Sequence, residues 1–464
     1  MVGHGDLLGI GSAVGSLMAD ERTLLTDTLT VALSDHLLGI HIDQLVLQAG
    51  AACVDNKNFH KSNPPIEKCK FMTYTMIVHF NCIFKHFLKV GENMSRAGVI
   101  CEFNPFHNGH KFLLEKIKSN YADEIVCIMS GNFVQRGDIA ITDKYTRTKA
   151  ALANGADMVV ELPTVYALSS AQRFAENGVR IASELHCDIM CFGSEDPIEK
   201  IYNALEILDS DTVQQKIAQL MRDGDYYPRA LSNAVGKEYA EIIGKPNNIL
   251  AIEYIRACRR YNLTPVAIPR NGVEHDSEMI SGDIASATMI RQLIRNGRDY
   301  AQFTPMHVTH VASIERIEAV FLYHLKTFKS EELKRIADIN EGLENRIIEI
   351  SKRYNSLIEI LEHTKTKRYI MSRLRRILCC AVLGITEQMQ HNSVPYIRVL
   401  GFDDNKKHII QSRSLPLIVD VRRGYDLLDD SAKEIFDIDI KATELMNIAS
   451  DQQNNEFSQG ILKL

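Results

Sequence analysis

Two histidines three residues apart, His107 and His110, are the side chains of this sequence best suited to chemistry. An imidazole can donate a hydrogen bond to a phosphate oxygen, and two together can stabilise a phosphate that gains charge as it is attacked. Gly109, which lies between them, lets a phosphate approach the backbone closely. This combination predicts a site for the phosphates of a nucleotide.

The residues around the histidines predict a strand, a polar turn and a helix, in that order. Residues 97–101 are a short apolar run, Asn104-Pro105 and Asn108-Gly109 are turn dipeptides, and a helical period follows from Lys111. The first turn of a helix presents unpaired N–H groups and a partial positive charge. The histidines therefore fall where an anion binds favourably.

His-x-Gly-His between a strand and a helix resembles the signature of the nucleotidyltransferase superfamily, which also contains the class I aminoacyl-tRNA synthetases. A capped loop with incidental histidines is the alternative. Zinc is the poorer interpretation, because two histidines lack the third and fourth ligands and no cysteine pair stands nearby. We therefore predict no protein-held metal.

Length and composition predict an ordinary globular protein of two or three domains, since the chain has 464 residues, 45% of them hydrophobic and 24% charged. The net charge of −6 argues against a wholly basic nucleic-acid coat, so RNA contact requires a local patch. The ten cysteines form no Cys-x-x-Cys pair, which favours reduced thiols in the cytoplasm. Residues 1–20 lack the basic start of a secretory signal.

Residues 1–93 are the least informative part. The apolar stretch 71–84 has Asn81, Lys85 and two histidines in or beside it, which makes a poor membrane span and leaves a helix lying on a membrane surface as an alternative. We expect 1–93 to be an appended extension and the functional fold to begin at Met94.

From Met94 the pattern alternates strand and helix, which predicts an α/β fold with a doubly wound parallel sheet, Rossmann-like, over 94–311. The predicted strands are 97–101, 123–131, 158–163, 188–193 and 264–270, separated by helices that include 144–154, 171–185 and 252–261. Ligands bind at the carboxyl ends of such strands. Polar clusters lie at several of these ends: Gln135 and Arg136 follow the second strand, the segment Gly193-Ser194-Glu195 follows the fourth, and Arg270 closes the fifth. Asn247 and Asn248 open a helix, where either can cap it or contact a ribose or base.

A second phosphate-binding element is predicted at residues 284–291. Ser286 is a natural N-cap, and Ile290 begins a helical apolar face. Ser286, Thr288 and Arg291 would hold the β- and γ-phosphates opposite the histidines. The alternative is a capped surface helix with no ligand.

Residues 312–464 are predicted to form a mostly helical C-terminal domain. Segment 365–376 is basic, and on one helix Ile370, Leu374, Ile377 and Leu378 would face inward. A basic helix face suits an RNA backbone, although a solvated face paired with glutamates is the alternative. The expected RNA contacts are Lys365, Arg368, Arg373, Arg375 and Arg376. Residues 415–420 are a possible strand, and we expect the tail from Ser450 to be frayed.

Several longer segments resemble the bacterial tRNA(Met) cytidine acetate ligase family in sequence and order, from Met94 to near the end of the chain. They are residues 102–110, 130–137, 155–163, 246–250 and 286–291. The family usually has Tyr where this chain has Phe103. Residues 1–93 have no counterpart in this resemblance.

The resemblance implies that acetate and ATP form acetyl-adenylate, with Mg²⁺ on the departing pyrophosphate. The acetyl group then passes to the wobble cytidine of elongator tRNA(Met), giving N4-acetylcytidine in the cytoplasm. The rivals are an adenylyl- or cytidylyltransferase for a small metabolite and a non-catalytic RNA-binding protein. Neither a membrane nor DNA is an expected partner.

The resemblance also assigns residues. His107 and His110 would be catalytic, and Arg136 and Lys144 are weaker candidates for the tRNA or acetate side. Glu102 could aid magnesium or cap the turn, and either Asn247 or Asn248 would contact ATP. The expected ATP contacts are Ile100, Cys101, Glu102, Phe103, Asn104, Pro105, Phe106, His107, Asn108, Gly109, His110, Lys111, Phe112, Leu113, Gly193, Asn247 and Arg270, together with Ser286, Thr288 and Arg291.

Overall fold

The computed structural model describes residues 95–223, 225, 227–269, 282–340 and 342–464. All of them fall in one unit of the chain, 78–464. The expectation that 1–93 is an appended extension therefore lies outside the described residues.

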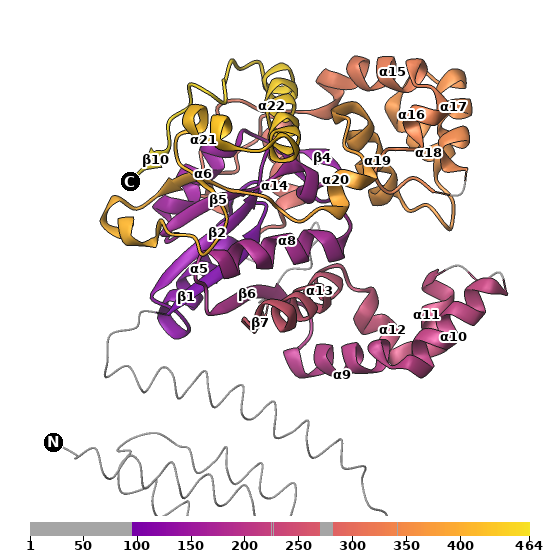
Figure 1. Cartoon of the computed structure of the whole chain (residues 1–464), viewed down its shortest axis with the longest axis horizontal. Helices are drawn as coiled ribbons and strands as arrows, with labels where there is room; N and C mark the ends of the chain where they lie inside the picture. Colours follow the sequence, from indigo (N-terminus) through magenta and orange to yellow (C-terminus); the bar gives the residue numbers. More distant parts are fainter. Residues whose placement is uncertain (1–94, 224, 226, 270–281, 341) are drawn as a thin grey trace, which may run out of the picture. The chain divides into compact units, whose positions relative to one another are not determined.

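A mainly parallel sheet forms the centre of the described unit (Figure 1). Its strand order is β10-β8-β5-β2-β1-β6-β7, and β9 pairs with β8. The parallel strands are β1 (Arg96–Cys101), β2 (Glu124–Ser130), β5 (Met158–Leu162), β6 (Ile189–Ser194) and β7 (Thr264–Pro269). They confirm the predicted strands and the Rossmann-like fold class.

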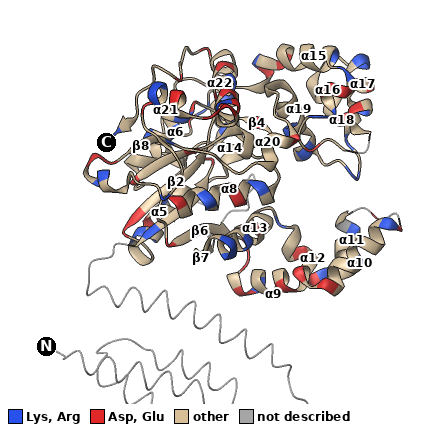
Figure 2. Ribbon diagram, viewed as in Figure 1, with Lys and Arg blue, Asp and Glu red and all other residues tan. Residues whose placement is uncertain are grey.

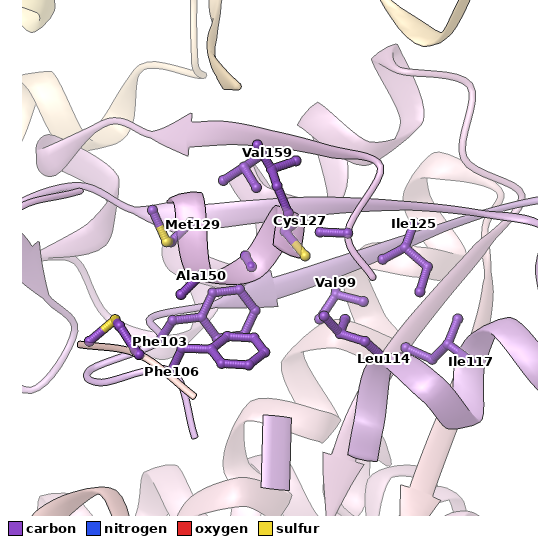
Figure 3. Packing of buried hydrophobic residues seen from close by; sticks show 14 of the residues in the cluster. Val99, Phe103, Phe106, Leu114, Ile117, Ile125, Cys127, Met129, Ala150 and Val159 are labelled. Atoms are coloured by element: carbon purple, nitrogen blue, oxygen red, sulfur yellow. The ribbon is translucent and has the colours of Figure 1, made fainter. Parts of the chain in front are cut away.

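Helices cover both faces of this sheet, which is why every residue of β2 is buried. On one face, Val99, Cys127, Met129 and Val159 of neighbouring strands belong to the same buried cluster as Leu114 (Figure 3). That face carries α5 (Asn108–Asn120), α6 (Lys144–Ala153) and α14 (Ala287–Arg295). The other carries α8 (Ala171–Glu184) and α13 (Pro246–Tyr261).

Short elements complete the N-terminal part. A hairpin follows β2, with antiparallel strands β3 (Phe133–Val134) and β4 (Asp138–Ile139). A helical insertion between β6 and α13 was not predicted. The remaining helices here are α7 (Thr164–Ala167), α9 (Ile198–Asp209), α10 (Asp211–Arg222), α11 (Tyr227–Val235), α12 (Lys237–Gly244) and η1 (Ala301–Phe303).

The C-terminal third is mostly helical, as expected, and begins with a group of helices that pack on one another (Figure 1). These are η2 (Ile314–Ile317), α15 (Glu318–Thr327), α16 (Ser330–Leu333), α17 (Leu343–Arg353), α18 (Leu357–Thr364) and α19 (Met371–Leu383). The next helix, α20 (Glu387–His391), contacts α7. No helix in the described residues combines the length and apolar content needed to cross a bilayer.

The predicted boundary at 311/312 needs revision, because the chain afterwards returns to the sheet. Strand β8 (Ile397–Phe402) pairs antiparallel with β5, and β9 (Leu417–Ile418) and β10 (Leu462–Lys463) pair with β8. The elements between them are η3 (Asp404–Ile409), α21 (Val421–Leu427) and α22 (Asp430–Ser450). The strand predicted within 415–420 is confirmed, whereas β8 was missed.

The expectation of a frayed tail after Ser450 is wrong. The Glu456 carboxylate is buried in ion pairs with Lys144 and Arg398, and Leu462 pairs with Gly401 of β8. A polar composition suggested fraying, but buried cations elsewhere in the fold hold this carboxylate in place.

Candidate active site

The predicted strand, turn and helix are all present around the two histidines. β1 ends at Cys101 and α5 begins at Asn108, so residues 102–110, which we call the HxGH turn, lie at the carboxyl edge of the sheet. His107 is the N-cap of α5, and its Nδ1 accepts from Gly109 N–H at 3.1 Å. His110 lies in the first turn, and its Nδ1 accepts from His107 N–H at 3.2 Å.

These hydrogen bonds determine the tautomers of the two rings. A neutral imidazole has one N–H, and a ring nitrogen that accepts a bond does not carry it. The proton of each ring is therefore on Nε2. The rings stack with centroids 3.7 Å apart, so the two Nε2–H donors belong to one rigid pair.

The two histidines differ in their surroundings. His107 is buried, with 5% of its surface exposed, whereas His110 is partly exposed. His110 packs against Phe103 and Phe106, with ring centroids at 5.0 and 5.7 Å (the two phenylalanines are labelled in Figure 3). Aromatic edges thus fix His110 from one side while the backbone fixes its Nδ1.

The second predicted element, α14, lies directly beside the HxGH turn. Ser286 caps α14 as predicted, accepting from Met289 N–H at 3.2 Å. Arg291 donates to the carbonyl of Asn104 at 2.7 Å and to Thr288 Oγ1 at 3.0 Å. In this structure, therefore, Arg291 supports the turn, and its contact with phosphates stays a prediction.

Glu102 connects the turn to the hairpin. Its Oε1 accepts from Gln135 N–H at 2.8 Å. Burial raises the pKa of the Glu102 carboxyl, although the Gln135 N–H and the charges of Arg136 and Arg291 oppose the rise. Of the two roles left open for Glu102, the structure shows the one that holds the turn.

Asn247 and Asn248 open α13, and their environments separate them. Asn248 is buried and bonds Glu195 N–H, Asp196 Oδ2 and the Ile242 carbonyl. Asn247 donates to Glu195 Oε1 at 2.8 Å and lies closer to solvent. Asn247 is therefore the better ligand candidate, since Asn248 already has partners for both its donor and its acceptor atoms.

The other predicted ATP contacts have these positions. Ile100 and Cys101 end β1, Gly193 lies in β6, and Lys111, Phe112 and Leu113 occupy the first turns of α5. Asn108 donates to the carbonyls of Asp283 and Gln302, both at 2.9 Å. Arg270 lies outside the described residues.

The expectation that Lys144 contacts tRNA or acetate is wrong for this conformation. Its side chain is 1% exposed and forms ion pairs with Glu161 and Glu456, each at 2.7 Å. A buried cation paired on both sides is part of the core, not a surface contact. Arg136, by contrast, lies in the hairpin close enough to Glu102 to influence its pKa.

The predicted basic helix is shorter than expected. It begins at Met371, so Lys365 and Arg368 precede it and Ile370 is exposed, whereas Leu374, Ile377 and Leu378 are buried as predicted. Arg373 and Arg376 pair with Asp338 at 3.1 and 3.4 Å, and Arg375 is exposed. Figure 2 shows basic and acidic segments interspersed over these helices rather than one continuous basic face.

The basic helix nevertheless lies against the hairpin. A Cβ atom built on Gly137 would be 2.3 Å from the backbone N of Arg376 and 2.5 Å from the carbonyl carbon of Arg375. Because Gln135 of the same hairpin holds Glu102, α19 is linked through few residues to the HxGH turn.

Two residues in contact with the HxGH turn were missed by sequence reasoning, Arg147 and Thr304. Arg147 donates to the Glu102 carbonyl at 2.7 Å, and Thr304 donates to the Phe106 carbonyl. Arg147 did carry a signal, since it shares a helix face with Ala150 and Ala151, where an arginine is out of place without a buried partner.

Comparisons with known proteins agree with this geometry. A family model described as HIGH nucleotidyl transferase matches residues 94–460. A tRNA(Met) cytidine acetate ligase of Clostridium kluyveri is 34% identical over 406 residues, covering 79% of this chain and 97% of the relative. One from Acetivibrio thermocellus is 33% identical over 413 residues, covering 80% and 100%.

Two crystal structures of Thermotoga maritima TmcAL are also similar. The first matches with a TM-score of 0.74 at 28% identity, and the second, which has alpha-thio ATP bound, with 0.71 at 26%. Each match covers 80% of this chain and 100% of the other.

Proposed function

This chain belongs to the tRNA(Met) cytidine acetate ligase family, and from that membership and the site geometry we propose that it joins acetate to tRNA(Met) with ATP as co-substrate. In the first step an acetate oxygen attacks the α-phosphorus of ATP, the bond to the β-phosphate oxygen breaks, and pyrophosphate leaves. In the second, the exocyclic amine of the wobble cytidine of elongator tRNA(Met) attacks the acetyl carbon. AMP leaves, the amine gives up a proton, and N4-acetylcytidine results.

The observation that carries the proposal is the pair of stacked imidazoles whose Nδ1 atoms both accept backbone N–H bonds. Two Nε2–H donors fixed beforehand suit an α-phosphate that gains negative charge as it becomes five-coordinate. The N-terminus of α5 adds its partial positive charge. Attack by acetate needs alignment and charge stabilisation rather than a protein nucleophile.

The proposed ATP contacts are the HxGH turn with Ile100, Cys101 and the first turns of α5, then Gly193 and Asn247. Ser286, Thr288 and Arg291, at the start of α14, complete the set. Arg270 is proposed from the family resemblance alone. A relative's structure with alpha-thio ATP supports ATP as the nucleotide.

Magnesium does not fit a protein-held site here. The described residues contain no group of three or more His, Cys, Asp or Glu side chains that could hold a metal ion. The Glu102 carboxylate lies near Arg136, Arg291 and Arg147, whose charges oppose a second cation.

For the tRNA we propose contacts along the hairpin and the basic segment: Arg136, Lys365, Arg368, Arg373, Arg375 and Arg376. Arg375 is the strongest candidate, because it is exposed at the point where α19 touches the hairpin. We also propose a cytoplasmic location, which the free thiols of Cys101, Cys127, Cys187, Cys258, Cys379 and Cys380 support.

The test is pyrophosphate exchange into ATP with and without acetate, followed by mass spectrometry of nucleosides from tRNA(Met) incubated with the protein, ATP and acetate. Acetate-dependent exchange and N4-acetylcytidine support the proposal. Exchange with another acceptor and not with acetate would point to a metabolite nucleotidyltransferase. Tight tRNA binding without any exchange would point to a non-catalytic RNA-binding protein.

A further inference from the structure

We infer that Arg147 is a positioning residue of the proposed active site, holding the HxGH turn at a set distance from the end of β2. This inference rests on the proposed function. Arg147 lies on α6 and is fully buried. Among the described residues, its hydrogen bonds go to backbone carbonyls and not to either histidine.

Its guanidinium donates only to backbone carbonyls in those bonds. Nη1 donates to Glu102 O at 2.7 Å and to Ser130 O at 3.0 Å, Nε donates to Thr142 O at 3.2 Å, and Nη2 donates to Gly131 O. The five N–H groups of arginine point in a fixed planar fork, so one side chain sets four backbone oxygens relative to one another.

The four oxygens belong to the segments that build the site. Glu102 follows the last residue of β1, and Ser130 and Gly131 end β2 and start the loop to the hairpin. The strands are neighbours, with Cys101 opposite Met129. Where parallel strands end, their carbonyls lose ladder partners and need another donor when buried. Arg147 supplies that donor to both strands at once.

The charge of Arg147 persists at neutral pH. Burial lowers its pKa to about 10, while Asp143 and other nearby groups oppose the fall. A fixed positive charge therefore lies behind the chain that carries the histidines. No carboxylate of the described residues forms an ion pair with Arg147 within 4.0 Å. Its guanidinium therefore interacts with backbone carbonyls instead of a carboxylate.

Arg398 provides a matched control within the same domain. It is also buried, at 2% exposure, but its guanidinium pairs with carboxylates, Glu161 at 3.1 Å and Glu456. Loss of Arg398 should weaken the fold without shifting the HxGH turn, since Glu161, Glu456 and Tyr145, which its guanidinium bonds, all lie outside the turn.

The experiment compares Arg147→Lys with Arg398→Lys in acetate-dependent pyrophosphate exchange, each assayed at the same interval below its own Tm. Lysine keeps the charge but cannot reach four carbonyls. Because misplacement of the reacting groups by about 1 Å can cost about 100-fold in rate, we expect Arg147→Lys to lower kcat about 10- to 100-fold. Its KM for ATP and the kcat of Arg398→Lys should each change less than about 3-fold.

Equal losses of kcat in the two variants, or an Arg147→Lys enzyme as fast as wild type, would overturn the positioning role. Arg147→Gln, which keeps two donors, is the second variant. If neither Arg147 variant folds while Arg398→Lys does, Arg147 serves the stability of the domain and the inference is also wrong. A wild-type protein that shows no acetate-dependent exchange instead refutes the proposed function.

Discussion

Each histidine of the site uses one ring nitrogen for the backbone and presents the other as a donor. The acceptor role of Nδ1 follows from helix capping, because the first turn of α5 has N–H groups without intrahelical partners. Capping and catalysis thus depend on the same two rings. The spacing of the motif reflects this double requirement, since an N-cap bonds residues two or three positions on.

At this scale we expect His110→Ala to lower acetate-dependent exchange about 100- to 1,000-fold, the usual effect of removing one transition-state donor. His110→Gln, whose amide nitrogen lies near the place of Nε2, should lose less. His310→Ala, at an exposed position, is the control. Exchange rates at saturating ATP and acetate decide the matter, and equal activity of His110→Ala and His310→Ala would contradict the assignment.

The adjacent asparagines predict opposite phenotypes. Asn248→Ala removes the three hydrogen bonds of a buried amide, to Glu195 N–H, the Asp196 carboxylate and the Ile242 carbonyl, and should lower the free energy of unfolding by about 1–3 kcal/mol. Asn247→Ala should instead raise the KM for ATP with little change in Tm. Thermal unfolding and exchange kinetics of both variants test this, and a stable Asn248→Ala with weakened ATP binding would reverse the choice.

Among the elements, the contact of the hairpin with α19 decides how the helical region meets the nucleotide site. Gly137 allows it in two ways, through a left-handed φ of +74° and through the absence of a side chain against the α19 backbone. Asp338 then orients the start of α19 by pairing with Arg373 and Arg376.

Gly137→Ala should therefore destabilise the protein more than Gly297→Ala. Gly297 also has a left-handed φ, +62°, but no atom within 4 Å of its added Cβ. Both variants carry the conformational cost of about 1–2 kcal/mol, and Gly137→Ala should add about 1–3 kcal/mol for the steric clash. Urea unfolding measures the difference, and equal midpoints at equal slopes would show that the hairpin can move away from α19.

Charge reversal at Arg375 tests whether tRNA binds where α19 meets the hairpin. Arg375→Glu should weaken tRNA(Met) binding at least about 10-fold and flatten its salt dependence, because a phosphate contact is lost and repulsion is introduced. Acetate-dependent exchange should be unchanged. Arg353→Glu, a reversal at an exposed position of α17, is the control for net charge. If both variants bind tRNA equally, the contact lies elsewhere.

Over the whole molecule, distant segments meet in a buried group of charges beneath the site. Lys144 and Glu161 come from the N-terminal part, whereas Arg398, Asp439 and Glu456 come from the C-terminal part. The two cations hold the pKa of Glu456 well below its usual range against the effect of burial. This group joins β8, α22 and the tail to the nucleotide-binding half.

Asp439 should make stability depend on pH in the direction opposite to that of Glu456. Burial, with Glu161 nearby, raises its pKa from an ordinary value near 4 to about 7. Between these values the folded state binds the extra proton, so the free energy of unfolding falls as pH rises from about 4 to about 7. Asp439→Asn, which can still bond Thr164 N–H and Tyr396, should lose this contribution and gain stability relative to wild type over that range.

Unfolding free energies across that pH range test the prediction. Asp430→Asn, exposed on the same helix, is the control. A difference between Asp439→Asn and wild type that stays constant from pH 4 to pH 7 would contradict it.

The amino-acid sequence by itself determined the five parallel strands, the helices between them and the histidine pair at the edge, because each follows from apolar spacing and turn residues within about 15 positions. It also placed Ser286 at a helix N-cap and Leu374 on a buried helix face. Only the tertiary structure decided that β8 joins the sheet, that Lys144 is buried and that Arg147 holds the turn. The reason is distance along the chain: Tyr145, beside Lys144, meets Glu456 across 311 positions, and local pattern carries no information about partners that folding brings from so far away.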